Sequence, residues 1–402
     1  MSLPGVFSGV RIIELAQFVF VPGASVLLAD QGAEVIKIES PGQGDPYRTL
    51  KIGDGREVGT TNLAMEQNNR GKKSVALDLK TEEGREALLR LIETADVFIT
   101  SLRPKAIRAL KLDVEHLRAR NPKLIYARGN GLGFKGAEAD KAGFDASSFW
   151  ARGGMAYAFT LPGNEPTPPR PAMGDHSGAT SLAFAIAGAL FKKAATGEPS
   201  VVETSLLQTA VWMLSSDVTY SQTPGYQVHS AQGNPYPLMR GYPTKDGRLI
   251  QLMLLDPRPH WPGLCKMLEI EDLVDDPRFD DNASRMRNVN ELAAILGERI
   301  ARHDWAHWQP IFDAWDAPWE LVRTIQDLHS DPQVLANNMI FTLDVGGNPV
   351  RVVSGPATFD GRATPVDPKG SPGMGEHTDE LLLGAGYSAS DIAHLKTRNI
   401  AQ

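Results

Sequence analysis

The chain has 402 residues, of which 42% are hydrophobic and 22% are charged, a balance typical of globular proteins and sufficient for two domains with separate cores. A formal net charge of −7 argues against a dedicated nucleic-acid-binding protein, because such proteins carry a basic segment or face. The single cysteine, Cys265, excludes an internal disulfide framework and a cysteine-based zinc site, and we therefore expect a cytoplasmic protein.

Apolar, β-branched runs alternate with helical patterns through about residue 150. Strands are expected at residues 10–15, 34–39, 74–79, 96–100 and 124–129. Thr81, followed by Glu82 and Glu83, predicts the N-cap of a helix that runs to about Ala95. This order predicts right-handed crossovers and a parallel sheet with helices on both faces.

Beyond residue 215 the pattern changes to a Pro-, Gly- and Tyr-rich stretch, followed by Trp-rich helical segments. Strand and loop character returns in "VRVVSGPATFDGRATP" near the end of the chain. We therefore expect an α/β fold, with a Rossmann-like large domain and a smaller α+β domain. The expected segments are residues 1–215 (first part of the large domain), 236–320 (small domain) and 321–402 (return to the large domain).

Two motifs suggest cofactor or metal chemistry but lack the required context. "GLGFKG" at 131–136 satisfies the dinucleotide-binding spacing, yet no apolar helix follows it, so a loop is expected. His303 and His307 lie one helical turn apart, as in the helix of a zinc protease. In this chain Asp304 would have to replace the longer glutamate base of such a helix. We assign no metal. No Gly-x-Ser-x-Gly serine is present either.

An acidic residue, Asp175, precedes an apolar helix in "GDHSGATSLAFAIAGALF". From Ala179 to Phe191 the apolar residues surround most of the helix, which predicts a helix buried on nearly all sides, too short to span a bilayer. Two interpretations of Asp175 remain open. It could cap the helix, with Ser177 sharing that role, or its carboxylate could be a nucleophile beside free backbone N–H groups.

Several segments, in order, resemble the family III CoA-transferases, the group that contains formyl-CoA transferase and carnitine CoA-transferase. They are "LADQGAEVIKIESPGQGDPYR", "NRGKKSVALDLKTEEGREALL", "GDHSG", "TGEPSVVETSLLQTA", "YPTKDG" and "GEHTDE". The resemblance covers about residues 8–395. It implies that Asp175 is the nucleophile, which exchanges CoA between an acyl-CoA and a free carboxylic acid through an aspartyl anhydride and an aspartyl-CoA thioester. No tightly bound cofactor is implied.

The same resemblance places CoA over the large domain. It implies contacts from Leu77, Lys80, Ser101, Leu102, Arg103 and Asn130. From their charge, Arg70, Lys72 and Lys73 are further candidates for phosphate contacts, although lysine clusters are more often a solvated face. The chain departs from the family pattern at Phe20-Val21-Pro22, where most members have Ala-Gly-Pro, and at Ser101-Leu102.

The resemblance also implies an interlocked homodimer whose long linkers, near residues 215–235 and 320–345, wrap the partner. The active site is then expected at the domain and subunit boundary, with no nucleic-acid or membrane partner. One alternative is a 2-methylacyl-CoA racemase, but Phe144 replaces the histidine base that such enzymes have in Gly-His-Asp. A second alternative is a non-catalytic acyl-CoA-binding relative. His176 is not required by the transferase chemistry.

Overall fold

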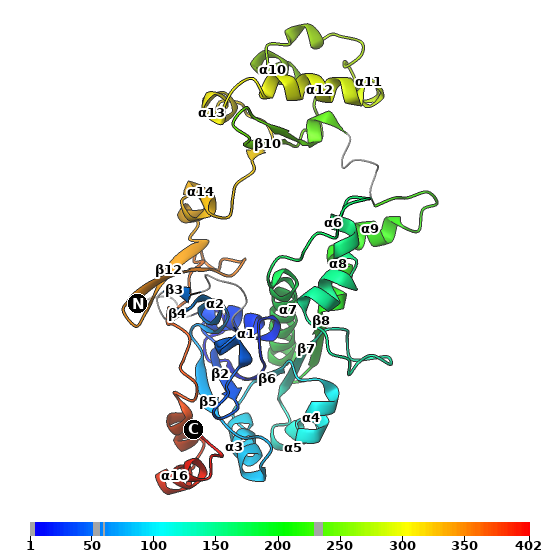
Figure 1. The fold of residues 1–402 in the computed structure, drawn as a ribbon. Helices are drawn as coiled ribbons and strands as arrows, with labels where there is room; N and C mark the ends of the chain where they lie inside the picture. The colour runs from blue at the N-terminus through cyan, green and yellow to red at the C-terminus, as the bar shows by residue number, and fades with distance from the viewer. Residues whose placement is uncertain (1–4, 51–56, 59–60, 229–235) are drawn as a thin grey trace. The chain divides into compact units, whose positions relative to one another are not determined.

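The structure is a computed structural model that describes residues 5–50, 57–58, 61–228 and 236–402. The chain forms two compact units (Figure 1). The larger unit takes in residues 1–160, 165–220 and 332–402, and the smaller unit takes in residues 161–164 and 221–331. In the described residues no helix is long and apolar enough to cross a bilayer.

In the described part of the chain, the larger unit is built on a six-stranded parallel sheet with strand order β5-β2-β1-β6-β7-β8. The strands are β1 (Arg11–Leu15), β2 (Glu34–Glu39), β5 (Lys73–Ala76), β6 (Val97–Thr100), β7 (Ile125–Asn130) and β8 (Val201–Ser205). The first five confirm the strands expected from the sequence. Their apolar runs are nearly continuous because both faces of a parallel sheet are covered.

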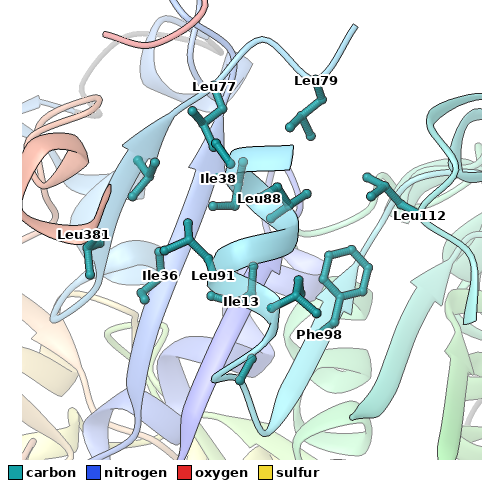
Figure 2. Close-up of a cluster of buried hydrophobic side chains, with 14 of the residues drawn as sticks. Ile13, Ile36, Ile38, Leu77, Leu79, Leu88, Leu91, Phe98, Leu112 and Leu381 are labelled. Carbon is teal, nitrogen blue, oxygen red and sulfur yellow. The ribbon is translucent and has the colours of Figure 1, made fainter. Parts of the chain in front are cut away.

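One face of this sheet packs against helices that lie far apart in the sequence. These are α3 (Glu82–Ile92), α4 (Pro104–Leu110), α5 (Val114–Arg120), α15 (Thr378–Gly384) and α16 (Ala389–Thr397). Figure 2 shows the core on this side, where Leu88 and Leu91 of α3 meet Ile13, Ile36 and Phe98 of the strands. The expected cap is confirmed, since the Thr81 hydroxyl accepts a hydrogen bond from the Gly84 N–H at 3.1 Å.

The other face is covered by α1 (Phe20–Asp30), the π-helical turn η2 (Asp145–Ala151), α7 (Met173–Thr196) and α8 (Leu206–Met213). Only one side of α7 faces this core, through residues such as Leu182 and Ile186. On its other side, Phe184 and Phe191 are 79% and 77% exposed. The prediction that this helix is buried on nearly all sides is therefore wrong for the single chain, because one layer of sheet and helices covers only one face of it.

The remaining elements of the larger unit are short. They are η1 (Pro46–Arg48), β3 (Glu57–Val58), β4 (Thr61–Asn62), α2 (Leu63–Asn69), α6 (Met155–Phe159), α9 (Ser215–Tyr220), α14 (Pro332–Ala336), β12 (Ile340–Val345) and β13 (Asn348–Val353). Near the C-terminus, Leu77 forms an antiparallel bridge with Ala401, and the Asp78 N–H donates to the Ile400 carbonyl at 2.8 Å. The last residues of the chain thus lie against the end of β5.

The smaller unit has a three-stranded antiparallel sheet, in strand order β11-β10-β9, with helices packed on an aromatic core. Its elements are η3 (Pro237–Met239), β9 (Gly241–Pro243), β10 (Leu249–Leu252), α10 (Trp261–Met267), η4 (Glu271–Leu273), α11 (Asn282–Arg287), α12 (Val289–Ile300), α13 (Trp305–Asp313), β11 (Trp319–Leu321) and η5 (Asp327–His329). His303 and His307 stack with ring centroids 3.9 Å apart. The described residues contain no group of three or more His, Cys, Asp or Glu side chains that could hold a metal ion.

Candidate active site

Helix α7 begins at Met173, so Asp175 lies within its first turn. The N-cap residue is Ala172, which has a φ of 58° and supplies no side-chain cap. The cap comes instead from Asp145, whose Oδ1 accepts a hydrogen bond from the Gly174 N–H at 3.1 Å. Ser177 donates its hydroxyl to the Met173 carbonyl at 2.8 Å. The capping interpretation of Asp175 and Ser177 is therefore wrong, because the Gly174 N–H donates to Asp145 and the Ser177 hydroxyl bonds within the helix instead.

Glycine at position 174 allows this close approach. A Cβ there would lie 2.2 Å from Cγ of Phe149 and 2.3 Å from Oδ1 of Asp145. Both distances are far inside van der Waals contact, so any larger residue would push η2 away from α7. Glycine at position 174 thus lets Asp145 approach closely enough to cap the helix, and the carboxylate of Asp175 is not used for the cap.

The carboxylate of Asp175 is half-buried and lies near a second carboxylate, that of Asp145. Burial, and then the neighbouring carboxylate of Asp145, raise its pKa from the ordinary 3.8 to about 7. It forms no side-chain hydrogen bond with the described residues. A carboxylate that is desolvated and not held by donors keeps its lone pairs available for attack on an electrophile.

The ring of His176 contacts helix α2. Its Nε2 lies 3.0 Å from Oδ1 of Asn68, whose Nδ2 already donates to the Ala64 carbonyl at 2.9 Å. The amide oxygen therefore accepts, and the Nε2–H of His176 donates. Burial and the nearby Arg70 lower the pKa of His176 below its ordinary value.

Three of the residues expected to contact CoA meet at one cavity of about 230 Å³, at the carboxyl ends of β1, β2 and β5. Leu77, Lys80 and Leu102 line it together with Gln17 of the loop between β1 and α1. The carboxyl edge of a parallel sheet is the usual place for a nucleotide-containing ligand in open α/β folds. Three of the expected contacts, including the cation Lys80, thus lie together at this edge of the sheet.

The other three expected residues do not line this cavity. Ser101 accepts a hydrogen bond from the Gln17 N–H at 3.2 Å, and Arg103 donates to the Asp140 carbonyl at 3.2 Å. Asn130 closes a turn with Gly133, accepting from its N–H at 2.6 Å and donating to its carbonyl at 2.8 Å. Their side chains have structural partners in the single chain.

The basic residues of the "NRGKK" segment are not a solvated face. Arg70 is ion-paired with Asp30 at 2.6 Å, and both side chains are buried. Lys72 is fully buried, and half-buried Lys73 pairs with Glu380 at 2.7 Å. The structure therefore corrects both interpretations of this cluster, as phosphate ligands or as surface charge, because each cation already has an acidic partner.

A buried charge network, which the sequence analysis did not identify, lies beneath the loop between β1 and α1. Glu14 binds Lys37 at 2.9 Å and Lys72 at 2.7 Å. Burial alone would raise the pKa of Glu14, but the two lysines lower it to about 2. Lys37 also donates to the Ala16 carbonyl and Lys72 to the Pro22 carbonyl, each at 2.9 Å. The network therefore fixes both ends of the loop that borders the cavity.

The "GLGFKG" segment is a loop, as expected, with Gly133 and Gly136 at positive φ and no helix before η2. Phe144, which follows it, is 58% exposed and makes an edge contact with Phe18 at a centroid distance of 5.4 Å. The residue in the place of the racemase histidine is thus a surface aromatic, not a core residue. It carries no titratable proton.

Comparison with known proteins establishes the family. The sequence model of CoA-transferase family III matches residues 7–378. The chain belongs to this family. It is 33% identical to (R)-2-hydroxy-4-methylpentanoate CoA-transferase from Clostridioides difficile, over 98% of this chain and 99% of that protein. It is 34% identical to cinnamoyl-CoA:phenyllactate CoA-transferase from Clostridium sporogenes, over 97% and 96%.

A solved structure shows the same fold. The crystal structure of a CAIB/BAIF family protein from Brucella suis matches with a TM-score of 0.81 and 28% identity, over 95% of this chain and 100% of that one. The resemblance inferred from the motifs is confirmed. The protein is an enzyme of the acyl-CoA:carboxylate CoA-transferase class, and its substrates are CoA thioesters and carboxylic acids.

Proposed function

We propose that Asp175 is the nucleophile that carries CoA from an acyl-CoA to a free carboxylic acid. The observation that carries this proposal is the state of its carboxylate, which is half-buried, has no hydrogen-bond donor among the described residues, and has its pKa raised to about 7. The positive end of the α7 dipole stabilises the anionic form once the proton is lost. A carboxylate kept uncommitted at this position gains nothing for stability, which favours a chemical role.

The transfer proceeds in balanced steps. An oxygen of Asp175 attacks the thioester carbonyl carbon, the C–S bond breaks, and CoA leaves as a thiolate from a mixed anhydride. The thiolate then attacks the aspartyl carbonyl carbon, which releases the donor acid and leaves an aspartyl-CoA thioester. The acceptor carboxylate repeats both steps in reverse order, so that acyl-CoA leaves and the Asp175 carboxylate is restored.

CoA binding is assigned to the cavity at the carboxyl ends of β1, β2 and β5. Lys80 supplies a cation for a phosphate, and Leu77 and Leu102 supply apolar walls for the adenine. Ser101, Arg103 and Asn130 remain proposed contacts through the resemblance.

We also propose the interlocked homodimer. Helices α7, α8 and α9 expose a large apolar surface around a hollow of about 1030 Å³. Its exposed members include Phe184, Trp212, Met213 and Val218. Soluble monomers rarely expose such contiguous apolar area, and a second copy of the chain is the partner that the family resemblance implies. A stable folded monomer at micromolar concentration in sedimentation would contradict this.

The alternatives are less well supported. Racemisation by two bases lacks its second base, because Phe144 cannot accept a proton. A non-catalytic acyl-CoA-binding role would leave the raised pKa of Asp175 without a purpose. A cytoplasmic location is proposed from the lone, buried Cys265.

The test is chemical trapping of the acylated enzyme. Wild type incubated with a working acyl-CoA donor and then with hydroxylamine should yield a hydroxamate on the peptide that carries Asp175, detected by mass spectrometry. The peptide with Asp145 is the internal control, because that carboxylate faces the helix N-terminus and should stay unmodified. Asp175→Asn, which should still bind CoA, is the matched variant. Unchanged exchange by this variant, with no hydroxamate in the wild type, would remove Asp175 from the mechanism.

A further inference from the structure

Three aromatic side chains meet beside the N-terminus of α7. Phe18 makes edge contacts with Phe144 at 5.4 Å and with Tyr47 at 6.4 Å between ring centroids. Ala172, the N-cap residue of α7, packs against the same cluster. Tyr47 is buried and Phe18 half-buried, whereas Phe144 is 58% exposed. The exposed edge of the cluster is therefore an apolar wall formed by Phe18 and Phe144.

This aromatic wall lies close to the proposed nucleophile. Phe144 directly precedes Asp145, whose carboxylate contacts the Gly174 N–H at 3.1 Å and raises the pKa of Asp175. Phe144 and Asp175 are therefore the chain neighbours of two residues, Asp145 and Gly174, that are hydrogen-bonded to each other. An acyl group whose carbonyl carbon meets Asp175 would have its side chain within reach of these rings.

The backbone of Phe18 is held in a conformation that bulky residues avoid. Its φ is 66°, in the left-handed region. Oδ1 of Asp45 accepts the Phe18 N–H at 3.1 Å, and the other carboxylate oxygen of Asp45 is ion-paired with the buried Lys37 at 2.9 Å. Strain that is maintained by buried charged groups is typical of functional positions. The charge network therefore fixes the backbone of Phe18, whose ring contacts Phe144.

The charges around the wall favour an uncharged side chain. Four neighbouring cations are each already ion-paired with an acid, namely Arg48, Lys37, Lys72 and Arg70. None of them is left to receive a second carboxylate. The carboxylates of Asp145 and Asp175 would instead repel one.

We propose that Phe18 and Phe144 determine substrate specificity by binding the aryl or branched-alkyl side chain of a monocarboxylic acyl group, and that they discriminate against dicarboxylic acids. This inference rests on the proposed function of Asp175. The aromatic rings offer edge and face contacts to an aryl group and apolar contact to a branched chain. Both contacts exclude water from the thioester that Asp175 attacks.

The first experiment measures exchange of label between each acyl-CoA and its own free acid, so that no second substrate has to be known. The donors are 3-phenylpropionyl-CoA, 4-methylpentanoyl-CoA and glutaryl-CoA. Wild type should prefer the first two, and Phe144→Ala should lower their kcat/KM about tenfold or more while leaving that of glutaryl-CoA little changed. Phe159→Ala is the matched control, because Phe159 is 55% exposed and stacks on Trp150 at 5.8 Å, outside the wall. It should leave the preference unchanged.

The second experiment measures binding of the same CoA esters to Asp175→Asn by calorimetry, and so does not depend on turnover. This variant should bind 3-phenylpropionyl-CoA more tightly than glutaryl-CoA, and adding Phe144→Arg should reverse the order by placing a cation in the wall itself. Equal or tighter binding of glutaryl-CoA without that arginine would refute the proposed role of Phe18 and Phe144. An equal loss of kcat/KM for all three donors in Phe144→Ala would refute it as well. Tight binding of 3-phenylpropionyl-CoA with no exchange of label by wild type would support the role of Phe18 and Phe144 in binding the acyl group. It would at the same time refute the proposed transferase role of Asp175.

Discussion

Replacing Asp175 with asparagine should stabilise the folded protein relative to wild type, and this gain should increase as the pH rises. The pKa of about 7 lies roughly 3 units above the ordinary 3.8, and each unit corresponds to about 1.36 kcal/mol. The full cost of ionising this group in the folded state is therefore on the order of 4 kcal/mol. Because the side chain is only half-buried, solvent screens part of this, and we expect about 2 kcal/mol.

The sign follows from proton binding. Between pH 3.8 and about 7 the folded state keeps the Asp175 proton that the unfolded state has lost, so wild-type stability falls over this window and levels off above it. Asparagine cannot ionise and does not contribute to this fall. The free energy of unfolding of the variant should thus exceed that of wild type by about 1–2 kcal/mol more at pH 8.5 than at pH 5. Urea unfolding at both pH values measures the difference.

Glu165→Gln is the control for loss of one negative charge at an exposed position. The Asp175→Asn variant should also lose CoA exchange by three orders of magnitude or more, about what removal of a nucleophile costs. A stability gap that stays constant from pH 5 to pH 8.5 would refute the raised pKa. A stabilised variant with full exchange would refute the catalytic role.

Further predictions follow from the same contacts. Asp145→Asn should move the pH midpoint of kcat/KM below 7 but not to the ordinary range, because burial, the larger cause, still raises the pKa of Asp175; a pH–rate profile tests this. Lys72→Met should destabilise the chain by about 3–5 kcal/mol in urea unfolding by leaving Glu14 without one of its cations, and a loss below 1 kcal/mol would contradict a coupled network. Cys265, which is buried and has its thiol pKa raised to about 12, should react with a thiol reagent at pH 8 only after unfolding; fast labelling of the folded protein would show the opposite.

Local patterns in the sequence were sufficient for the framework of the larger unit. A strand covered on both faces needs an almost continuous apolar run, so β1, β2, β5, β6 and β7 could be located without any knowledge of their partners. A helix start is equally local, because the Thr81 hydroxyl reaches the N–H of Gly84 only three residues away. The order of the motifs was likewise enough to identify the family.

The roles of charged and aromatic side chains depended on segments that meet only in the fold. The cap of α7 comes from Asp145, 29 residues before Gly174, so sequence spacing could not tell that Asp175 is left uncommitted. Glu14 and Lys72 are 58 residues apart, and Phe18 and Phe144 are more than a hundred apart. A pKa, an ion pair or an aromatic contact depends on distance and burial in three dimensions, and neither quantity is contained in the periodicity of the chain. Sequence alone therefore determined which elements form and to which family the chain belongs, whereas only the tertiary structure decided which carboxylate caps the helix and which one is half-buried with a raised pKa.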